Sequence, residues 1–128
     1  MHKEMISPKS KFTDITDNID KYINELDLQD GIVVLQVKDS EYAVVVTNSD
    51  PAHHEDIYLD LVRVIPTKLE VKSEDVSALA RQVRTSILGR SMPLSVVDSS
   101  LQLQTTDRVY LVTYLDSEAE VEVLMTAI

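Results

Sequence analysis

The stretch from Arg108 to Thr126, RVYLVTYLDSEAEVEVLMT, decides the fold class. Its first third is rich in β-branched and aromatic residues, and apolar side chains stand at every second position over Val121–Met125. An alternation of period two places successive side chains on opposite faces of a strand, so this pattern indicates a strand with one wet face. We therefore predict strands over residues 108–114 and 119–126, joined by a turn at 115–118.

Two valine-rich runs nearer the N-terminus extend the same prediction. Residues 31–37 and 42–47 are both typical of strands, and the polar residues 38–41 between them have the length of a hairpin connection. The run Val44–Val46 does not alternate, which predicts a central strand buried on both faces. A further alternating stretch, 94–103, indicates more strand after the last predicted helix.

Three segments predict helices. The first begins near Thr16, which we interpret as its N-cap. An Asp50-Pro51 pair predicts the start of the second, which ends at Pro66, and Ser73 caps a third that Gly89 closes. The predicted buried faces are Ile15, Ile19, Tyr22, Ile23 and Leu26 in the first helix, Ile57, Leu61, Val64 and Ile65 in the second, and Val76, Leu79, Ala80, Val83 and Ile87 in the third. This order of elements predicts an α+β fold, in which about three helices cover a largely antiparallel sheet.

The composition excludes several classes of function. The chain has 128 residues, a net charge of −10 and no cysteine. Such a charge repels phosphate backbones, so we expect no nucleic-acid partner, and a chain without Cys has no disulfide, thiolate zinc site or cysteine nucleophile. Its two glycines are too few for a phosphate-binding loop. With no apolar stretch long enough for a membrane span or signal peptide, we predict one cytoplasmic domain over residues 1–128 and no membrane partner.

The histidines do not predict a metal or catalytic centre. His2 lies near the N-terminus, and His53 and His54 are adjacent, whereas a metal-binding pair on a helix needs a spacing of three or four. The hydroxyls of Ser99 and Ser100 have no histidine near them in sequence to activate them. We therefore predict no catalytic residue, no metal site and no cofactor.

Several weak marks recur in a fixed order between Thr16 and Leu111. They are a turn glycine before a β-rich run, an Asp-Pro helix start, a helix ending in Gly and a Leu-x-Leu strand. The residues concerned are Gly31, Asp50, Pro51, Asp56, Leu61, Pro66, Ile87, Leu88, Gly89, Leu101, Leu103, Tyr110 and Leu111. In these marks the chain resembles the YjbQ-like family of uncharacterised proteins. The resemblance implies an α+β fold, a homotrimer with pockets between subunits, and a thiamine-phosphate-synthase-like activity in the family.

The chain departs from this family where chemistry would be expected. The family's His-Thr-Thr-Ala-type motif falls at Lys38–Glu41, its Glu at Thr47, a further His at Gln82 and its Trp at Thr106. The marks that a fold needs are kept, whereas the imidazoles, the carboxylate and the indole are replaced. We therefore do not extend the family's activity to this chain.

Two functions follow from these departures. The first is a catalytically degenerate, oligomeric subunit, expected as a trimer, that is structural or binds a small anionic ligand. The second is an enzyme with a rebuilt pocket between subunits that acts on a small phosphorylated metabolite, with Lys38 as a point charge for the anion. The pocket candidates are Lys38, Asp39, Ser40, Gln82 and Asp107.

Overall fold

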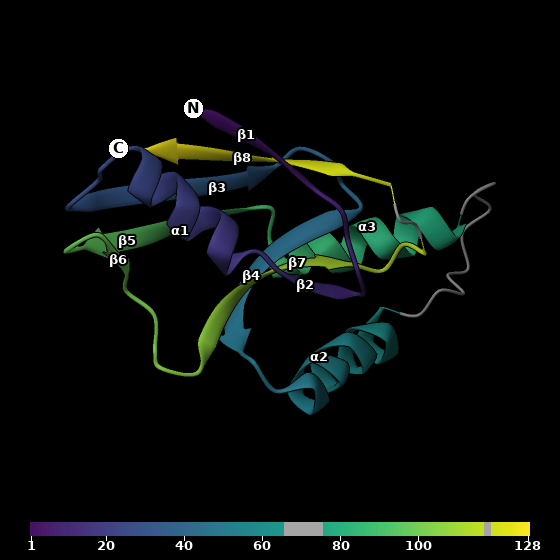
Figure 1. Ribbon diagram of the computed structural model, residues 1–128. Helices are drawn as coiled ribbons and strands as arrows, with labels where there is room; N and C mark the ends of the chain where they lie inside the picture. The colour runs from purple at the N-terminus through teal and green to yellow at the C-terminus, as the bar shows by residue number, and fades with distance from the viewer. Residues whose placement is uncertain (66–75, 117–118) are drawn as a thin grey trace.

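The computed structural model describes residues 1–65, 76–116 and 119–128 (Figure 1). Its helices are α1 (Thr16–Glu25), α2 (Pro51–Val64) and α3 (Val76–Leu88). Its strands are β1 (His2–Ile6), β2 (Phe12–Asp14), β3 (Gly31–Val37), β4 (Tyr42–Asn48), β5 (Ser91–Val97), β6 (Ser100–Leu101), β7 (Asp107–Thr113) and β8 (Val121–Ala127). The predicted α+β class with three helices is confirmed.

The strands form two sheets, and every described pairing is antiparallel. One sheet has the order β1-β8-β3-β5-β6 and the other β2-β7-β4. The hairpin predicted from β3 to β4 is wrong, and so is a direct pairing of β7 with β8, because the two members of each pair lie in different sheets. After β3 and after β7, the chain passes from one sheet to the other. A short connection therefore predicts that the chain turns, but it does not predict that the two strands it joins are hydrogen-bonded to each other.

Strand β4 is an edge strand rather than the predicted central one. It pairs only with β7 among the described strands, from Tyr42 opposite Thr113 to Asn48 opposite Asp107. Its first half is nevertheless buried on both faces, because Val44 faces the main core while Ala43 packs in a second cluster with Tyr110. The lack of alternation in Val44–Val46 therefore reflects side chains packed on both faces of the strand, and it does not mean that β4 lies in the middle of its sheet.

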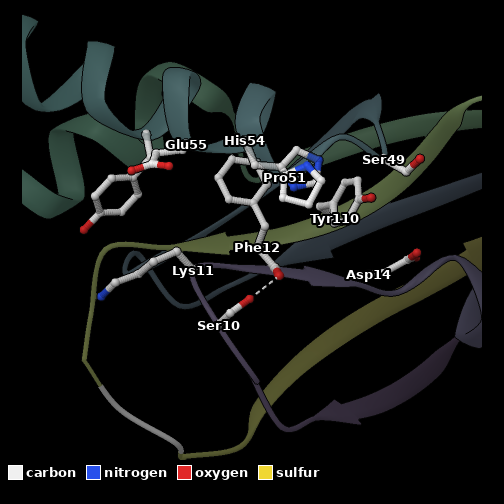
Figure 2. A pocket seen from close by; sticks show the side chains of 10 residues that line it. Ser10, Lys11, Phe12, Asp14, Ser49, Pro51, His54, Glu55 and Tyr110 are labelled. Atoms are coloured by element: carbon white, nitrogen blue, oxygen red, sulfur yellow. Dashed lines mark hydrogen bonds between the residues drawn. The ribbon is translucent and has the colours of Figure 1, made fainter.

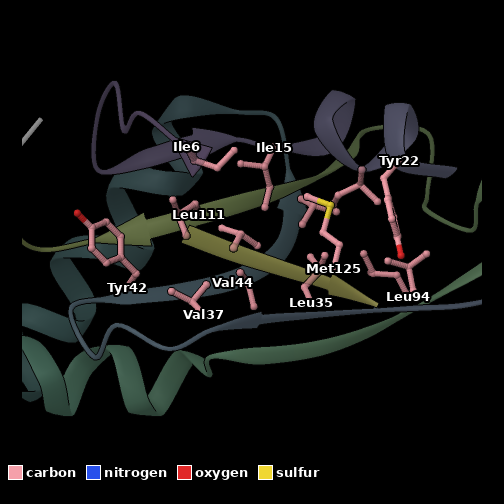
Figure 3. Close-up of a cluster of buried hydrophobic side chains, with 14 of the residues drawn as sticks. Ile6, Ile15, Tyr22, Leu35, Val37, Tyr42, Val44, Leu94, Leu111 and Met125 are labelled. Atoms are coloured by element: carbon pink, nitrogen blue, oxygen red, sulfur yellow. The ribbon is translucent and has the colours of Figure 1, made fainter. Parts of the chain in front are cut away.

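The main core lies between α1 and the two sheets (Figure 3). Ile15, Ile19 and Ile23 of the α1 segment are buried, as predicted, and Leu26 at its end is 48% exposed. Thr16 is not the predicted N-cap but the first helical residue, and Ile15 holds the cap position. The buried hydroxyl of Thr16 instead accepts a hydrogen bond of 2.8 Å from the Val109 amide, and this bond fixes α1 to β7.

Helix α2 starts as predicted but does not bury the predicted face. The Asp50 carboxylate accepts a hydrogen bond from the Ala52 amide at 2.9 Å, and Pro51 is the first helical residue. No residue of α2 is fully buried, and Val64 is 68% exposed. Of the predicted face, Ile57, Leu61 and Ile65 are half-buried. Ring contacts of His54 and Tyr58 add to them, and the apolar spacing did not predict these contacts.

The predicted face of α3 is confirmed in part, because Ala80 is buried and Val83 is half-buried. The buried residues of this helix are Ala80, Arg84 and Thr85, whereas Leu79 and Ile87 are exposed. Both polar side chains have backbone partners: the guanidinium of Arg84 donates two hydrogen bonds to the Ile65 carbonyl, and the Thr85 hydroxyl donates one to Ser40. Polar side chains with such partners can take core positions, which periodicity does not reveal.

The two ends of α3 were predicted with different outcomes. The predicted closure is confirmed, because Gly89 follows Leu88 with a φ of +104°. The predicted stop of α2 at Pro66 and the predicted cap at Ser73 lie outside the described residues, as does the side chain of Val76. Over the described ranges, none of the helices is long and apolar enough to cross a membrane.

Candidate functional site

The structure separates the five predicted pocket residues into two groups. Lys38, Asp39 and Ser40 lie together in the connection from β3 to β4, and α3, which carries Gln82, is bonded to that connection through Thr85. Asp107 stands at the opposite end of the β4–β7 ladder, next to Asn48. Six residues of strand correspond to roughly 20 Å, so one chain does not bring Asp107 to Lys38.

Asp39 and Ser40 hold the connection itself. The Asp39 carboxylate accepts a hydrogen bond of 2.9 Å from the Glu41 amide, and the Ser40 carbonyl accepts one of 2.6 Å from the Thr85 hydroxyl. Arg81 of α3 adds an ion pair with Glu41, with Nε 2.8 Å from the carboxylate. These contacts give the turn a fixed shape and leave Lys38 at its rim.

Lys38 lines a polar cavity of about 450 Å³ that the sequence did not predict. The other lining residues are Gln36, Val37, Arg90 and Ser91. Arg90 is there because β5 pairs with β3, and its guanidinium donates a hydrogen bond of 3.2 Å to the Lys38 carbonyl. The lining holds two cations and no carboxylate, and the Lys38 ammonium has no ion-pair partner in the described parts of the chain.

Asp107 lines a separate cavity of about 310 Å³ beside α1. Asp20 and Arg108 share this lining. Burial raises the pKa of Asp20, and the neighbouring charge of Asp17 raises it further. The cation of Arg108 is already shared by Asp14 and Asp17, at 2.8 and 3.0 Å. This cavity therefore offers carboxylates with a committed counter-ion, and it is not suited to an anion.

A third pocket, of about 570 Å³, lies between α2 and β2 (Figure 2). Its walls carry four rings, those of Phe12, His54, Tyr58 and Tyr110. The His54 ring stacks on Phe12, with centroids 4.6 Å apart and planes at 4°, and it meets Tyr110 edge-on at 4.4 Å. Sequence reasoning tested His54 only as a metal ligand and did not find this pocket, because its rings come from three distant segments.

One ring nitrogen of His54 is engaged by a hydrogen bond within the chain. Its Nε2 lies 2.6 Å from the Asn48 carbonyl. A carbonyl only accepts hydrogen bonds, so Nε2 carries the proton, and Nδ1 is the one ring nitrogen left that could bind a cation. Across the described ranges, no three histidine or carboxylate side chains converge on a point that would hold a metal ion.

This architecture defines a small α+β protein of two antiparallel sheets and three helices, with a basic cavity at one sheet connection and an aromatic pocket under α2. Three solved structures share the fold over nearly all of both chains. An uncharacterised conserved protein from Clostridium acetobutylicum has a TM-score of 0.90 and 21% identity and covers 100% of each chain. A YbjQ-like protein of unknown function from Sulfolobus solfataricus P2 has a TM-score of 0.88 and 19% identity, covering 98% of this chain and 94% of its own. A hypothetical protein from Aeropyrum pernix K1 has a TM-score of 0.86 and 22% identity, covering 99% and 96%.

The sequence also matches a known protein family. The pattern described as UPF0047 protein YjbQ-like matches residues 3–128, so the chain belongs to the YjbQ family. The predicted resemblance is thereby confirmed. No curated protein matches the sequence closely enough to be a relative. The three similar structures are described as uncharacterised, hypothetical or of unknown function, so they supply no activity for this chain.

Proposed function

We propose that this chain is a non-catalytic YjbQ-family subunit that binds a small anion in the cavity of Lys38 and Arg90. One observation carries the proposal: the charged groups in this lining are two cations, in a chain whose net charge is −10. In an acidic chain, a cavity that is lined by cations and by no carboxylate attracts an anion instead of repelling it. A phosphate or carboxylate group on a small metabolite fits this charge.

Screening makes the local cations more important than the net charge. At physiological ionic strength the Debye length is about 8 Å, so distant carboxylates contribute little to the potential in the cavity. The Lys38 ammonium supplies a point charge, and the Arg90 guanidinium keeps donors beyond the one that it gives to the Lys38 carbonyl. The two side chains together therefore suit an oxyanion.

The residues at the family's chemical positions support the non-catalytic part of the proposal. Thr47, Gln82 and Thr106 carry no group that exchanges a proton near neutral pH. Loss of one general acid or base typically costs a hundred- to ten-thousand-fold in rate. Asp39 is not among the residues that line the cavity, and one of its carboxylate oxygens accepts a hydrogen bond from the Glu41 amide. The cavity is suited to hold an anion but not to transform it.

Titration with inorganic phosphate tests the site. We expect Lys38→Gln and Arg90→Gln each to weaken binding by roughly fivefold or more, because a hydrogen bond to a charged group contributes about 1 kcal/mol or more. Lys3→Gln is the matched control, since Lys3 is exposed on β1 and its replacement removes the same charge. Equal weakening in all three variants would assign the binding to net charge and overturn the proposed site.

The same cavity favours one second function, an enzyme that acts on a small phosphorylated metabolite. Lys38 and Arg90 would hold its phosphoryl group, and a partner subunit would have to supply the missing acid or base. Turnover of thiamine-phosphate precursors by the purified protein, lost in Lys38→Gln, would establish this function. Binding without turnover supports the non-catalytic subunit.

We also propose that the working form is a homotrimer. Four large apolar side chains are exposed on α2 and α3: Leu59, Val64, Leu79 and Ile87. Exposed apolar side chains on two helices that follow one another in the chain favour a protein interface, and the resemblance to the family implies three subunits. Light scattering should give a mass of three times the 14.4 kDa of one chain. A mass of 14.4 kDa would refute the assembly.

A further inference from the structure

The pocket between α2 and β2 has aromatic walls on several sides. Phe12 comes from β2, Tyr110 from β7, and His54 and Tyr58 from α2. Figure 2 shows His54 and Glu55 on the helix side and Lys11, Phe12 and Asp14 on the strand side. Aromatic faces carry partial negative charge, so such walls favour flat apolar groups and cations.

Two of the three charged groups that line this pocket already have partners. The Asp14 carboxylate accepts hydrogen bonds from Arg108 at 2.8 Å and from the Thr16 amide at 2.9 Å. The Lys11 ammonium lies 2.7 Å from the Asp116 carboxylate. Asp14 shares the Arg108 cation with Asp17, and the Lys11 ammonium also lies 5.9 Å from the centre of the Tyr58 ring. Both groups therefore have partners within the chain and select a ligand less strongly than a charge without a partner.

Glu55 is the third charged group, and it differs from the other two. It lies on the first turns of α2, lines the pocket and is exposed. In the described parts of the chain its carboxylate has no hydrogen bond or ion pair. The pocket therefore presents aromatic faces together with one uncompensated negative charge.

We propose that this pocket is a binding site for a small aromatic amine. The flat ring of the ligand would pack against the face of Phe12 that is turned away from His54, because the Tyr58 ring already stacks on Tyr114 with centroids 4.3 Å apart. The ammonium group of the ligand would pair with the Glu55 carboxylate. An anionic ligand is disfavoured here by the same carboxylate. This site is independent of the anion site, because it uses other residues and the opposite sign of charge.

Tryptamine is a suitable probe, because the protein contains no tryptophan and the indole fluorescence then reports on the ligand alone. We expect tryptamine to bind and to shift the ring proton resonances of Phe12, His54, Tyr58 and Tyr110. Indole-3-acetate, with the same ring and the opposite charge, should bind more weakly. Failure of tryptamine to bind at millimolar concentration would overturn the proposal.

A pair of neighbouring substitutions locates the charge that matters. Glu55→Gln should weaken tryptamine binding by roughly two- to fivefold, the contribution of a partly exposed ion pair. Asp56→Asn is the matched control, because Asp56 is exposed on the same helix but does not line the pocket. Equal weakening by both substitutions, or unchanged binding in Glu55→Gln, would contradict the proposed role of Glu55. Phosphate binding should be unchanged in both variants.

Discussion

Helices α1 and α2 are held in place by different contacts. Helix α1 packs on the core between both sheets, whereas α2 contacts β2 and β7 of the three-stranded sheet. Under α1, Ile15, Ile19 and Ile23 are at most 1% exposed and pack into the main core. Under α2, no helical residue is buried, and the Tyr58 ring stacks on Tyr114 at 4.3 Å. A buried aliphatic side chain contributes about 1.5–3 kcal/mol, whereas an aromatic pair adds about 0.5–1.5 kcal/mol beyond its burial.

The contacts of α1 therefore contribute most to stability, whereas the surroundings of α2 leave space for a ligand. The aliphatic side chains of α1 pack directly into the main core, and the cavity beside this helix is small and mostly polar. The attachment of α2 leaves the larger, aromatic pocket beside it. Contacts that are fewer and more polar allow a local opening at lower free energy. The α2 region is thus the better place for a ligand, and the α1 region the better place for a stable core.

Truncation of one leucine in each region should break the comparison most clearly. Leu111→Ala removes a side chain that is 1% exposed in the main core, and we expect a loss of about 2–5 kcal/mol in the free energy of unfolding. Leu59→Ala on α2, where the side chain is 39% exposed, should cost below about 1 kcal/mol. Urea unfolding of both variants measures the difference. Equal losses would mean that assembly covers Leu59 as fully as the core covers Leu111.

The hydrogen bond from Val109 to Thr16 gives a smaller test on the α1 side. Thr16→Val keeps the shape but leaves the buried Val109 amide without an acceptor, which should cost about 1–3 kcal/mol. Thr16→Ser keeps the acceptor and is the control, with a smaller loss expected. Thermal or urea unfolding distinguishes the two. A Thr16→Val chain as stable as the Thr16→Ser chain would show that this hydrogen bond does not fix α1.

High pH should weaken the α2 side through Tyr114, whose hydroxyl donates to the Tyr58 carbonyl at 3.1 Å. Burial raises the pKa of Tyr114 to about 12, against an effect of Arg84 in the other direction. Because this pKa lies above the unfolded value of about 10, the stabilisation is complete below pH 10 and is lost as the pH rises towards 12. Between pH 9 and pH 11 we expect a loss of about 1 kcal/mol.

The control for this pH dependence is Tyr114→Phe, which has no phenol to titrate. Its stability should fall less between pH 9 and pH 11 than that of the unmodified chain. Some loss remains, because burial also raises the pKa of Tyr42 and of Tyr110. The same fall in both chains, measured by urea unfolding at the two pH values, would exclude Tyr114 as the source.

The sequence predicted the helices and strands of this fold better than the contacts between them. Local signals sufficed for the Asp50-Pro51 start of α2, the closure at Gly89 and the inward face of Val121–Met125. They failed where a side chain depends on a distant partner, as for the buried Arg84 and its carbonyl acceptor at Ile65. Spacing along one segment carries no information about such a partner.

The same limit explains the candidate sites. Lys38 was predicted as a possible anion ligand, and it does line a cavity, but Arg90 was missed because it reaches that cavity through the β3–β5 pairing. Asp107 was grouped with Lys38 through the resemblance, and one chain holds the two apart. The aromatic pocket was missed altogether, since Phe12, His54 and Tyr110 become neighbours only in the folded chain.

The pairing of strands that lie far apart in the sequence also affects how fast the molecule folds. Strand β1 pairs His2 with Met125, β2 pairs Phe12 with Val112, and β3 pairs Leu35 with Met125. Chains dominated by such distant pairings have a high contact order and fold in milliseconds to seconds rather than microseconds. On the ribosome, β1 and β2 are synthesised long before their partners β8 and β7, so their edges stay open to other chains until those later strands have emerged.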